Sequence, residues 1–191
     1  MTKKPEKSIL YALLSINKDD GGFAMGSANT IKDMARMAIC LALICVSAYI
    51  AVPVPFAAVV VSAVTLSMNL AAFLLTPMQT FVVLVSYVLL GVAGLPVFAN
   101  GGAGIGQLFG PSGGFLITFC IAYPVVSLLK GDKPNFKRYM LAVLVGIPIS
   151  YIGGIYTVMT VLGLSLNQTV LVAALPYIPF DIVKGAVAAV I

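Results

Sequence analysis

Apolar residues run almost unbroken through most of this chain, and charged residues are confined to a few places. No Asp, Glu, Lys or Arg occurs from Met37 to Leu129, and none occurs from Tyr139 to Phe180. A transmembrane helix needs about 20 consecutive apolar residues. These two stretches and the C-terminal segment therefore predict about six spans, and with them an all-α integral membrane protein embedded in a lipid bilayer.

Prolines, glycines and short polar turns indicate where the spans end. Pro53 and Pro55 end the first span because proline lacks the backbone N–H that a helix needs. The dipeptide Thr76-Pro77 separates the second span from the third, and Pro77 suits the start of a helix. We expect Pro148 and Gly153-Gly154 to interrupt the fifth span. The expected spans cover residues 31–51, 56–75, 78–92, 115–129, 139–162 and 169–191.

Basic residues form two groups, and these predict the orientation in the membrane. One group is N-terminal (Lys3, Lys4, Lys7, Lys18, Lys32 and Arg36), and the other lies in one loop (Lys130, Lys133, Lys137 and Arg138). Four expected spans separate them, so both groups lie on one side, as the positive-inside rule requires. Residues 1–30 are then a cytoplasmic tail, and residues 31–191 form the six-helix transmembrane domain. The last span stops at Ile191 without a polar tail, which suggests that C-terminal residues are missing.

Composition excludes several classes of function. The chain is 61% hydrophobic and 9% charged, whereas soluble domains carry about 25% charged residues. Its net charge of +5 comes from the two basic groups and does not indicate nucleic acid. There is no histidine and no phosphate-binding loop of the type G-x-x-x-x-G-K-[ST], and the three cysteines lie in apolar segments. We therefore expect no metal, no cofactor, no catalytic residue and no ATPase activity.

Asp181 and Lys184 are the only charged residues after Arg138, and they interrupt an apolar segment. A charge at this depth costs roughly 2.5–3.5 kcal/mol on insertion scales. Spaced three apart, the two lie on one helix face. They could pair with each other, although such a pair gains little over apolar side chains. We favour a binding site in which Lys184 binds a ligand carboxylate and Asp181 accepts ligand N–H groups.

Residues 94–114 form a glycine-rich loop that is nevertheless apolar. Irregular backbone at membrane depth is tolerated where it is buried in protein or lines a cavity. We therefore expect the loop to line a ligand pocket with Asn100, Gln107 and Ser112 as its polar side chains, and the alternative is a solvated loop. In the first span, Ala38 and Ala42 form a small-residue stripe that either packs internally or docks a partner membrane protein.

Three segments together resemble the BioY family: Gly94-Leu-Pro-Val-Phe98, Gly110-Pro-Ser-Gly-Gly114 and Pro179-Phe-Asp181-Ile-Val-Lys184-Gly. The resemblance covers roughly residues 36–191. It implies a six-helix substrate-specific (S) component of an energy-coupling factor (ECF) transporter, which captures biotin from outside a bacterial plasma membrane. Such a component would be multi-pass and would associate with a transmembrane coupling protein and two cytoplasmic ATPase subunits.

The resemblance also implies roles for particular residues. Asp181 and Lys184 match the membrane-embedded pair of the family's last helix, and residues 100–102 (Asn100, Gly101 and Gly102) match its loop asparagine and glycines. Ala38 and Ala42 match the motif that docks the coupling protein. On this basis Lys184 would hold the biotin carboxylate, and Asp181 would accept the ureido N–H groups.

Further pocket contacts are expected from the loop, where Phe98 and Phe109 would bury the biotin rings and Gln107 would add a polar contact.

Two features depart from the family pattern. Residues 56–61 are apolar where the family has a Thr- and Gln-containing stretch, and Thr76-Pro77 replaces Gly-Pro. These departures concern the first outer loop and the end of the second helix.

Other functions stay open at this point. The chain could be an S component for another vitamin, or a stand-alone carrier in which Asp181 carries a proton. A structural scaffold is also compatible with the hydropathy pattern, although it gives no reason for two deep charges.

Overall fold

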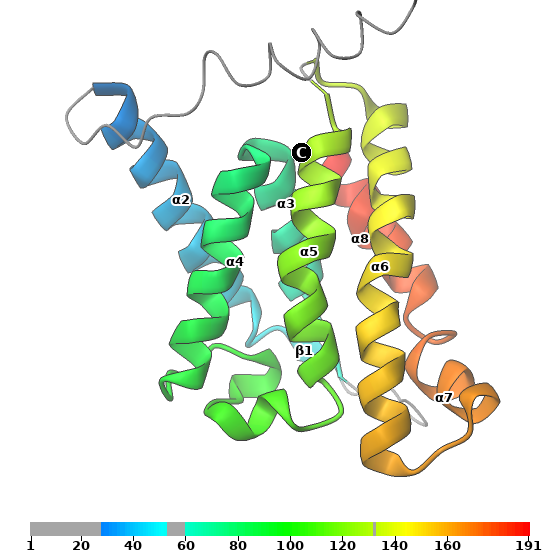
Figure 1. The fold of residues 1–191 in the computed structure, drawn as a ribbon. Coiled ribbons are helices and arrows are strands. Elements are labelled where there is room, and N and C mark those ends of the chain that lie inside the picture. The colour runs from blue at the N-terminus through cyan, green and yellow to red at the C-terminus, as the bar shows by residue number, and fades with distance from the viewer. Residues whose placement is uncertain (1–27, 53–59, 132) are drawn as a thin grey trace, which may run out of the picture. The chain divides into compact units, whose positions relative to one another are not determined.

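The computed structural model describes residues 28–52, 60–131 and 133–191 (Figure 1). The chain divides into two units, residues 1–35 and Arg36–Ile191. The predicted cytoplasmic tail lies outside the described residues except for residues 28–30, and so does the predicted proline turn from residue 53 onward. The second unit carries the candidate site.

Helices make up most of the described chain, which confirms the predicted helical class. In chain order the elements are α2 (Ala28–Ser47), β1 (Ala51–Val52), β2 (Val61–Ser62), α3 (Val64–Leu74), α4 (Pro77–Val92), α5 (Gly113–Leu129), α6 (Phe136–Leu162), α7 (Leu166–Ala173) and α8 (Ile178–Val190). Two short 3₁₀ turns, Ala99–Gly101 and Ile105–Leu108, lie in the glycine-rich loop. β1 and β2 pair antiparallel, with Ala51 opposite Ser62.

The second expected span is corrected, because residues 56–75 do not form one helix. Within the described part of this segment, strand β2 precedes the 11-residue helix α3. Val60 and Val61 are β-branched and favour extended backbone, and the backbone N–H of Ala63 donates to the carbonyl of Ile50 (2.9 Å). The chain therefore enters α3 from a hairpin instead of from a preceding helical turn.

The start of α4 agrees with the sequence prediction. Thr76 caps the helix together with Gln79, each side chain bonding the other residue's backbone N–H, and Pro77 occupies the first turn. Proline fits there because its missing N–H has no partner within the helix. The turn between α3 and α4 is therefore specified locally.

The fifth and sixth spans also differ from expectation. α6 runs unbroken for 27 residues through Pro148 and Gly153-Gly154. Its glycines do not end the helix, and they allow α5 to pack closely against it. A Cβ placed on Gly114 of α5 would lie 2.0 Å from the Gly153 carbonyl oxygen. The last segment is instead broken into α7 and α8, which meet at 42°.

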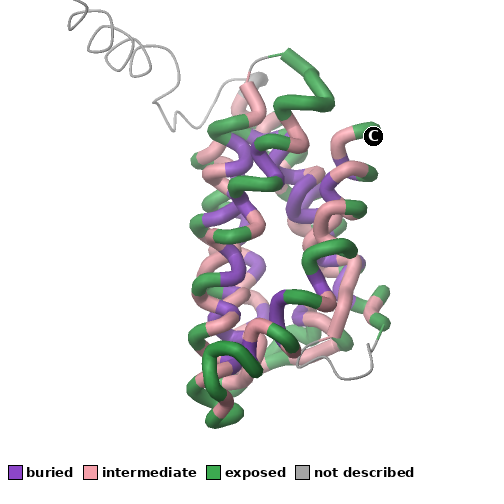
Figure 2. The backbone as a smooth tube through the Cα atoms, turned by 90° about the vertical axis from the view of Figure 1, so that its right-hand side faces the viewer, coloured by how far each residue is buried: buried purple, intermediate pink, exposed green. Residues whose placement is uncertain are grey.

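Buried residues lie where the helices of the second unit face one another (Figure 2). Ile44, Met68, Tyr87 and Val126 are at most 1% exposed and belong to one apolar core. Many large apolar side chains also lie on outward faces, such as Ile152 of α6 at 71% exposure. Soluble monomers rarely expose extensive apolar surface, so these faces suit contact with lipid.

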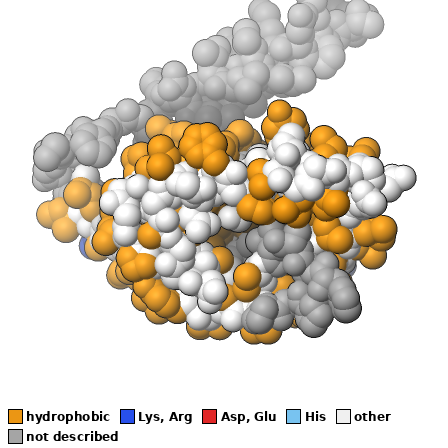
Figure 3. Space-filling view, turned by 90° about the horizontal axis from the view of Figure 1, so that it is seen from below, with side chains coloured by type: hydrophobic (Ala, Val, Ile, Leu, Met, Phe, Trp, Pro, Cys, Tyr) orange, Lys and Arg blue, Asp and Glu red, His pale blue; other side chains and the backbone are white. Residues whose placement is uncertain are grey.

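One described helix, α6, is by itself long and apolar enough to cross a membrane, and α7 with α8 would make a second such span if counted together. The helices α3, α4 and α5 are apolar but shorter. Figure 3 views the described chain from the end that carries the glycine-rich loop, and charged side chains are nearly absent there. The basic loop after α5 lies at the opposite end of that helix.

Lys130, in the loop directly after α5, joins that loop to α3. Its Nζ donates to the carbonyl oxygens of Ala72 (3.0 Å) and Leu75, and Ser127 Oγ also donates to Leu75 (2.6 Å). The last carbonyls of a helix lack partners within the helix, so these donors satisfy the end of α3. Burial lowers the pKa of Lys130.

Candidate functional site

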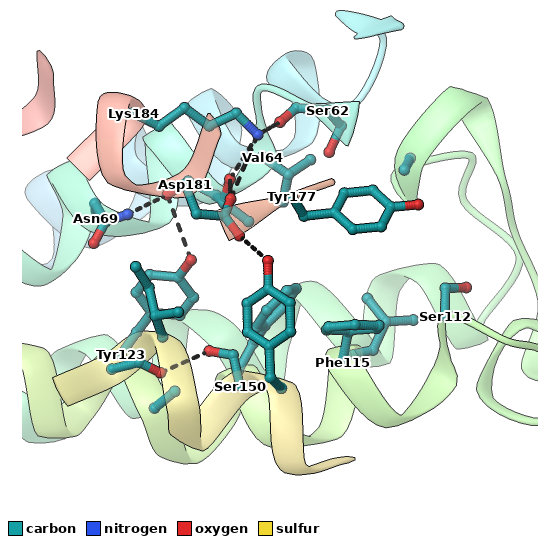
Figure 4. Close-up of a pocket in the computed structure, with 18 of the residues that line it drawn as sticks. Ser62, Val64, Asn69, Ser112, Phe115, Tyr123, Ser150, Tyr177, Asp181 and Lys184 are labelled. Atoms are coloured by element: carbon teal, nitrogen blue, oxygen red, sulfur yellow. Dashed lines mark hydrogen bonds and ion pairs between the residues drawn. The ribbon is translucent and has the colours of Figure 1, made fainter. Parts of the chain in front are cut away.

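A cavity opens among α3, α5, α6, α8 and the glycine-rich loop (Figure 4). The space between its lining atoms is about 1020 Å³ when it is counted out to the open mouth. Its walls are mainly apolar, with a few polar groups, as is typical of small-molecule sites. The apolar walls include Leu116, Phe115, Phe119, Val126, Val143 and Ile147, and the polar lining includes Asn69, Gln107, Ser112, Tyr151, Asp181 and Lys184.

The break before α8 places Asp181 in the first turn of that helix. The N-terminal end of a helix carries partial positive charge, which favours a carboxylate there. Gly185 allows α8 to lie close to α6, because a Cβ at that position would come within 2.5 Å of Val143. The side chains of Asp181 and Lys184 are 18% and 16% exposed, and both line the cavity.

Asp181 receives hydrogen bonds from two other helices. Tyr151 of α6 donates its hydroxyl to Oδ2 (2.7 Å), and Thr65 of α3 donates its hydroxyl to Oδ1 (3.2 Å). Each carboxylate oxygen thus has a protein donor, and the carboxylate is fixed in orientation.

Lys184 contacts the start of α3 and the strand before it. Its Nζ donates to the carbonyl oxygen of Ser62 (2.6 Å) and to Thr65 Oγ1 (3.1 Å), and it lies 3.7 Å from Asp181 Oδ1. The prediction that the two charges share one helix face is confirmed. They form an ion pair and also face the cavity, so the two interpretations of the sequence are compatible.

Further polar groups, from α3 and α5, lie beside the pair and against the Thr65 carbonyl. Asn69 Nδ2 donates to the Thr65 carbonyl (2.8 Å), and the Tyr123 hydroxyl lies 3.5 Å from that oxygen. Asn69 and Tyr123 are buried, and Figure 4 shows both next to Asp181. The cavity therefore offers amide and hydroxyl groups beside the charges.

The loop residues predicted for the site fall into two sets. Phe98 and Gln107 line the cavity, and Phe98 is 2% exposed and packs edge-on against Tyr87. Asn100 and its neighbours Gly101 and Gly102 lie next to Phe98 but are not among the lining residues.

Backbone bonds explain the position of this turn. Asn100 adopts a left-handed φ of 60° and donates its N–H to the Ala48 carbonyl (3.0 Å), while Phe98 N–H donates to Gly102 (3.0 Å). Phe109, predicted to cover the ligand rings, is 76% exposed.

The sequence analysis missed Thr65, Ser62, Asn69 and Tyr123 as site residues. One signal was present, because Thr65 and Asn69 are polar, four apart and therefore on one face of an apolar helix. Nothing in the sequence linked them to Asp181, which is 116 residues from Thr65.

The predicted docking stripe lies on α2, where Ala38 and Ala42 are both exposed. It stays a prediction. Among the residues that the structure describes, no group of three or more His, Cys, Asp or Glu side chains could hold a metal ion.

Known proteins resemble this chain over most of its length. The BioY family profile matches residues 19–191. The biotin transporter BioY of Thermotoga maritima is 34% identical over 164 residues, which cover 84% of this chain and 94% of that protein. The probable biotin transporter BioY of Pyrococcus horikoshii is 34% identical over 163 residues, covering 84% and 93%.

A solved structure shares the fold. It is the crystal structure of the S-component for biotin from an ECF-type ABC transporter, with a TM-score of 0.78, 21% identity, and coverage of 87% of this chain and 92% of that one. The family profile, the relatives and the shared fold agree over nearly the whole length. The chain belongs to the BioY family.

Proposed function

We propose that this membrane protein is the biotin-binding S component of an ECF transporter. The observation that carries the proposal is the ion pair of Asp181 and Lys184, each hydrogen-bonded to neighbouring elements, in the cavity of a BioY-family chain. Its relatives are named biotin transporters, and its structural neighbour is a biotin S component. The chain takes part in transport and not in catalysis.

Biotin complements the chemistry of the cavity. Its ureido N–H groups can donate to Asp181, which as a carboxylate has further lone pairs beyond those used by Thr65 and Tyr151. Its carboxylate is an anion for Lys184. Its fused rings would bury against apolar lining side chains, among them the aromatic rings of Phe98, Phe115 and Phe119.

The loop contributes the remaining proposed contacts. Gln107 reaches the cavity directly. Asn100, Gly101 and Gly102 would contribute backbone amides or the Asn100 side chain, and the bond between Phe98 and Gly102 ties their turn to a lining residue. We therefore propose that this turn contacts biotin through groups adjacent to the residues that line the cavity.

We propose six spans with the N-terminus in the cytoplasm of a bacterial cell, in its plasma membrane. α3 alone is short for a crossing. The backbone before it is non-helical, and Val60, Val61 and Ser62 line the cavity, which is a setting in which such backbone is tolerated at depth. Because the sequence lacks a phosphate-binding loop, uptake would depend on a coupling protein, docked at Ala38 and Ala42, and on two ATPase subunits.

Binding of labelled biotin to the purified protein tests the proposal. We expect binding by the wild type and a loss of at least about tenfold in affinity for Lys184→Ala and Asp181→Asn, since each removes a charge-assisted hydrogen bond. Lys133→Ala is the control, because Lys133 is exposed in the basic loop. A wild type that binds no biotin, or variants that bind as the wild type does, would contradict the assignment.

A further inference from the structure

A third side chain, from another helix, stands between the two charges of the site. Thr65, near the start of α3, places Oγ1 3.2 Å from Asp181 Oδ1 and 3.1 Å from Lys184 Nζ. The direct distance between Nζ and Oδ1 is 3.7 Å, beyond the usual range of about 2.7–3.2 Å for an N–H···O bond. The Thr65 hydroxyl therefore bridges a pair that does not make a direct hydrogen bond.

Chemistry fixes the direction of this bridge. A lysine ammonium can only donate, an ionised carboxylate can only accept, and a hydroxyl has one proton and two lone pairs. Thr65 must therefore accept from Lys184 and give its single proton to Asp181. Its β-branched side chain has few χ1 rotamers in a helix, and the bonds to Asp181 and Lys184 hold the hydroxyl in the observed one.

A direct contact between Lys184 and Asp181 would compete with ligand binding. Coulombic attraction between the two charges rises as they approach, and each group would then use the other as a hydrogen-bond partner. With Thr65 between them, Asp181 keeps spare lone pairs, and Lys184 uses two of its three N–H donors on Ser62 and Thr65. Both charges thus stay able to engage a ligand.

We propose that Thr65 is a positioning residue for ligand binding, whose hydroxyl holds Asp181 and Lys184 apart and oriented. This inference rests on the proposed function of the site. Tyr151 does not act in this way, because its hydroxyl bonds Asp181 alone of the two charges.

The test measures biotin affinity for three purified variants. Thr65→Val keeps the shape and removes the hydroxyl, and we expect it to weaken binding by at least about tenfold. Thr65→Ser keeps the hydroxyl and should stay within about threefold of the wild type. Thr80→Val is the matched control, because Thr80 is fully buried in α4, its hydroxyl bonds the nearby Thr76 carbonyl, and it is not among the lining residues of the cavity.

Two results would overturn the proposal. One is Thr65→Val binding as tightly as Thr80→Val, and the other is Thr65→Ser losing as much affinity as Thr65→Val. A purely local role in folding would instead lower the melting temperature of both valine variants without a difference in affinity between them.

A second measurement keeps the inference separate from the identity of the ligand. Melting temperatures are compared for Thr65→Val, Asp181→Asn and the double variant without any added compound. If the hydroxyl bridges the pair, the two losses should be less than additive. Additive losses would contradict the bridge even if biotin binds, whereas a wild type that binds no biotin but shows this coupling would refute only the proposed substrate.

Discussion

Asp181 illustrates how a carboxylate is accommodated deep in an apolar chain. It lies at the positive end of α8, accepts hydroxyl donors from α3 and α6, and has Lys184 one turn away. A buried charge is tolerated when it is paired and hydrogen-bonded. The residue is therefore held by three helices at once, and its orientation depends on each of them.

Removing one of these donors should weaken ligand binding without disturbing the fold. We expect Tyr151→Phe to lower biotin affinity about tenfold, because a hydrogen bond to a charged group contributes roughly 1.5–3 kcal/mol. Tyr156→Phe, at an exposed position of the same helix, should leave the affinity unchanged. Titration with labelled biotin measures both, and equal affinities for the two variants would show that the Tyr151 hydroxyl is not needed.

At this scale the sequence predicted the charged pair but not its partners. The spacing of Asp181 and Lys184 predicted that the two charges share one helix face, and both line the cavity. Thr65 and Tyr151 reach Asp181 across 116 and 30 residues, and no local pattern encodes such contacts. They follow from how α3 and α6 pack against α8.

The glycines of α6 allow close helix packing and do not break the helix. In α6, Gly153 was expected to break the helix, because glycine disfavours helix interiors. Instead it lets α5 approach, where Thr118 Oγ1 donates to the Ser150 carbonyl (2.9 Å) and Gly114 N–H donates to Thr157 (3.2 Å). Tertiary packing thus overrides the local preference. Figure 1 shows α5 and α6 side by side along their length.

Adding a single methyl group at this crossing should destabilise the protein. We expect Gly114→Ala to lower stability by about 1–3 kcal/mol, since its Cβ would lie 2.0 Å from the Gly153 carbonyl oxygen. Gly106→Ala is the control, because nothing lies within 4 Å of its Cβ. Melting temperatures of the purified variants compare the two, and an unchanged value for Gly114→Ala would mean that the helices can separate at little cost.

The starts of α3 and α4 show why one helix boundary was predicted correctly and the other was not. The start of α4 is encoded locally by Thr76, Pro77 and Gln79, and the prediction succeeded there. The hairpin before α3 depends on pairing between β1 and β2. This pairing joins two separate segments, so the only local signal for it is the run of β-branched valines before α3. Because valine is also strongly apolar, the hydropathy pattern predicted a membrane span there.

Over the whole chain, charge is distributed unequally between the two ends of the helices. Lys133 is exposed in the loop between α5 and α6, and Lys137 and Arg138 are exposed in the first turn of α6. The glycine-rich loop and the α6–α7 turn carry no charged residue. The positive-inside rule then assigns the basic loop to the cytoplasm, which agrees with the proposed topology.

Thiol labelling in intact cells tests this orientation. In a variant without Cys40, Cys45 and Cys120, a single cysteine at Asn167, exposed in α7, should react with a membrane-impermeant maleimide. A single cysteine at Lys133 should react only after the cells are opened, because the membrane shields the cytoplasmic side. The reverse pattern would mean that the protein has the opposite orientation in the membrane. Labelling of both cysteines in intact cells would mean that α6 does not cross the membrane.

Lys130 gives the basic loop a second role, in holding the protein together. Counted only as a positive charge, it is one of four basic residues from which a cytoplasmic position of the loop is predicted. Its ammonium is nevertheless committed to the end of α3, and Arg138 donates to the Leu129 carbonyl (3.0 Å). Only Lys133 and Lys137 of the four thus present their charges outward without such a bond to the backbone among the described contacts. In the proposed topology, Lys130 therefore contributes to the charge that orients the chain during insertion and also fixes the loop to the end of α3 once the helices assemble.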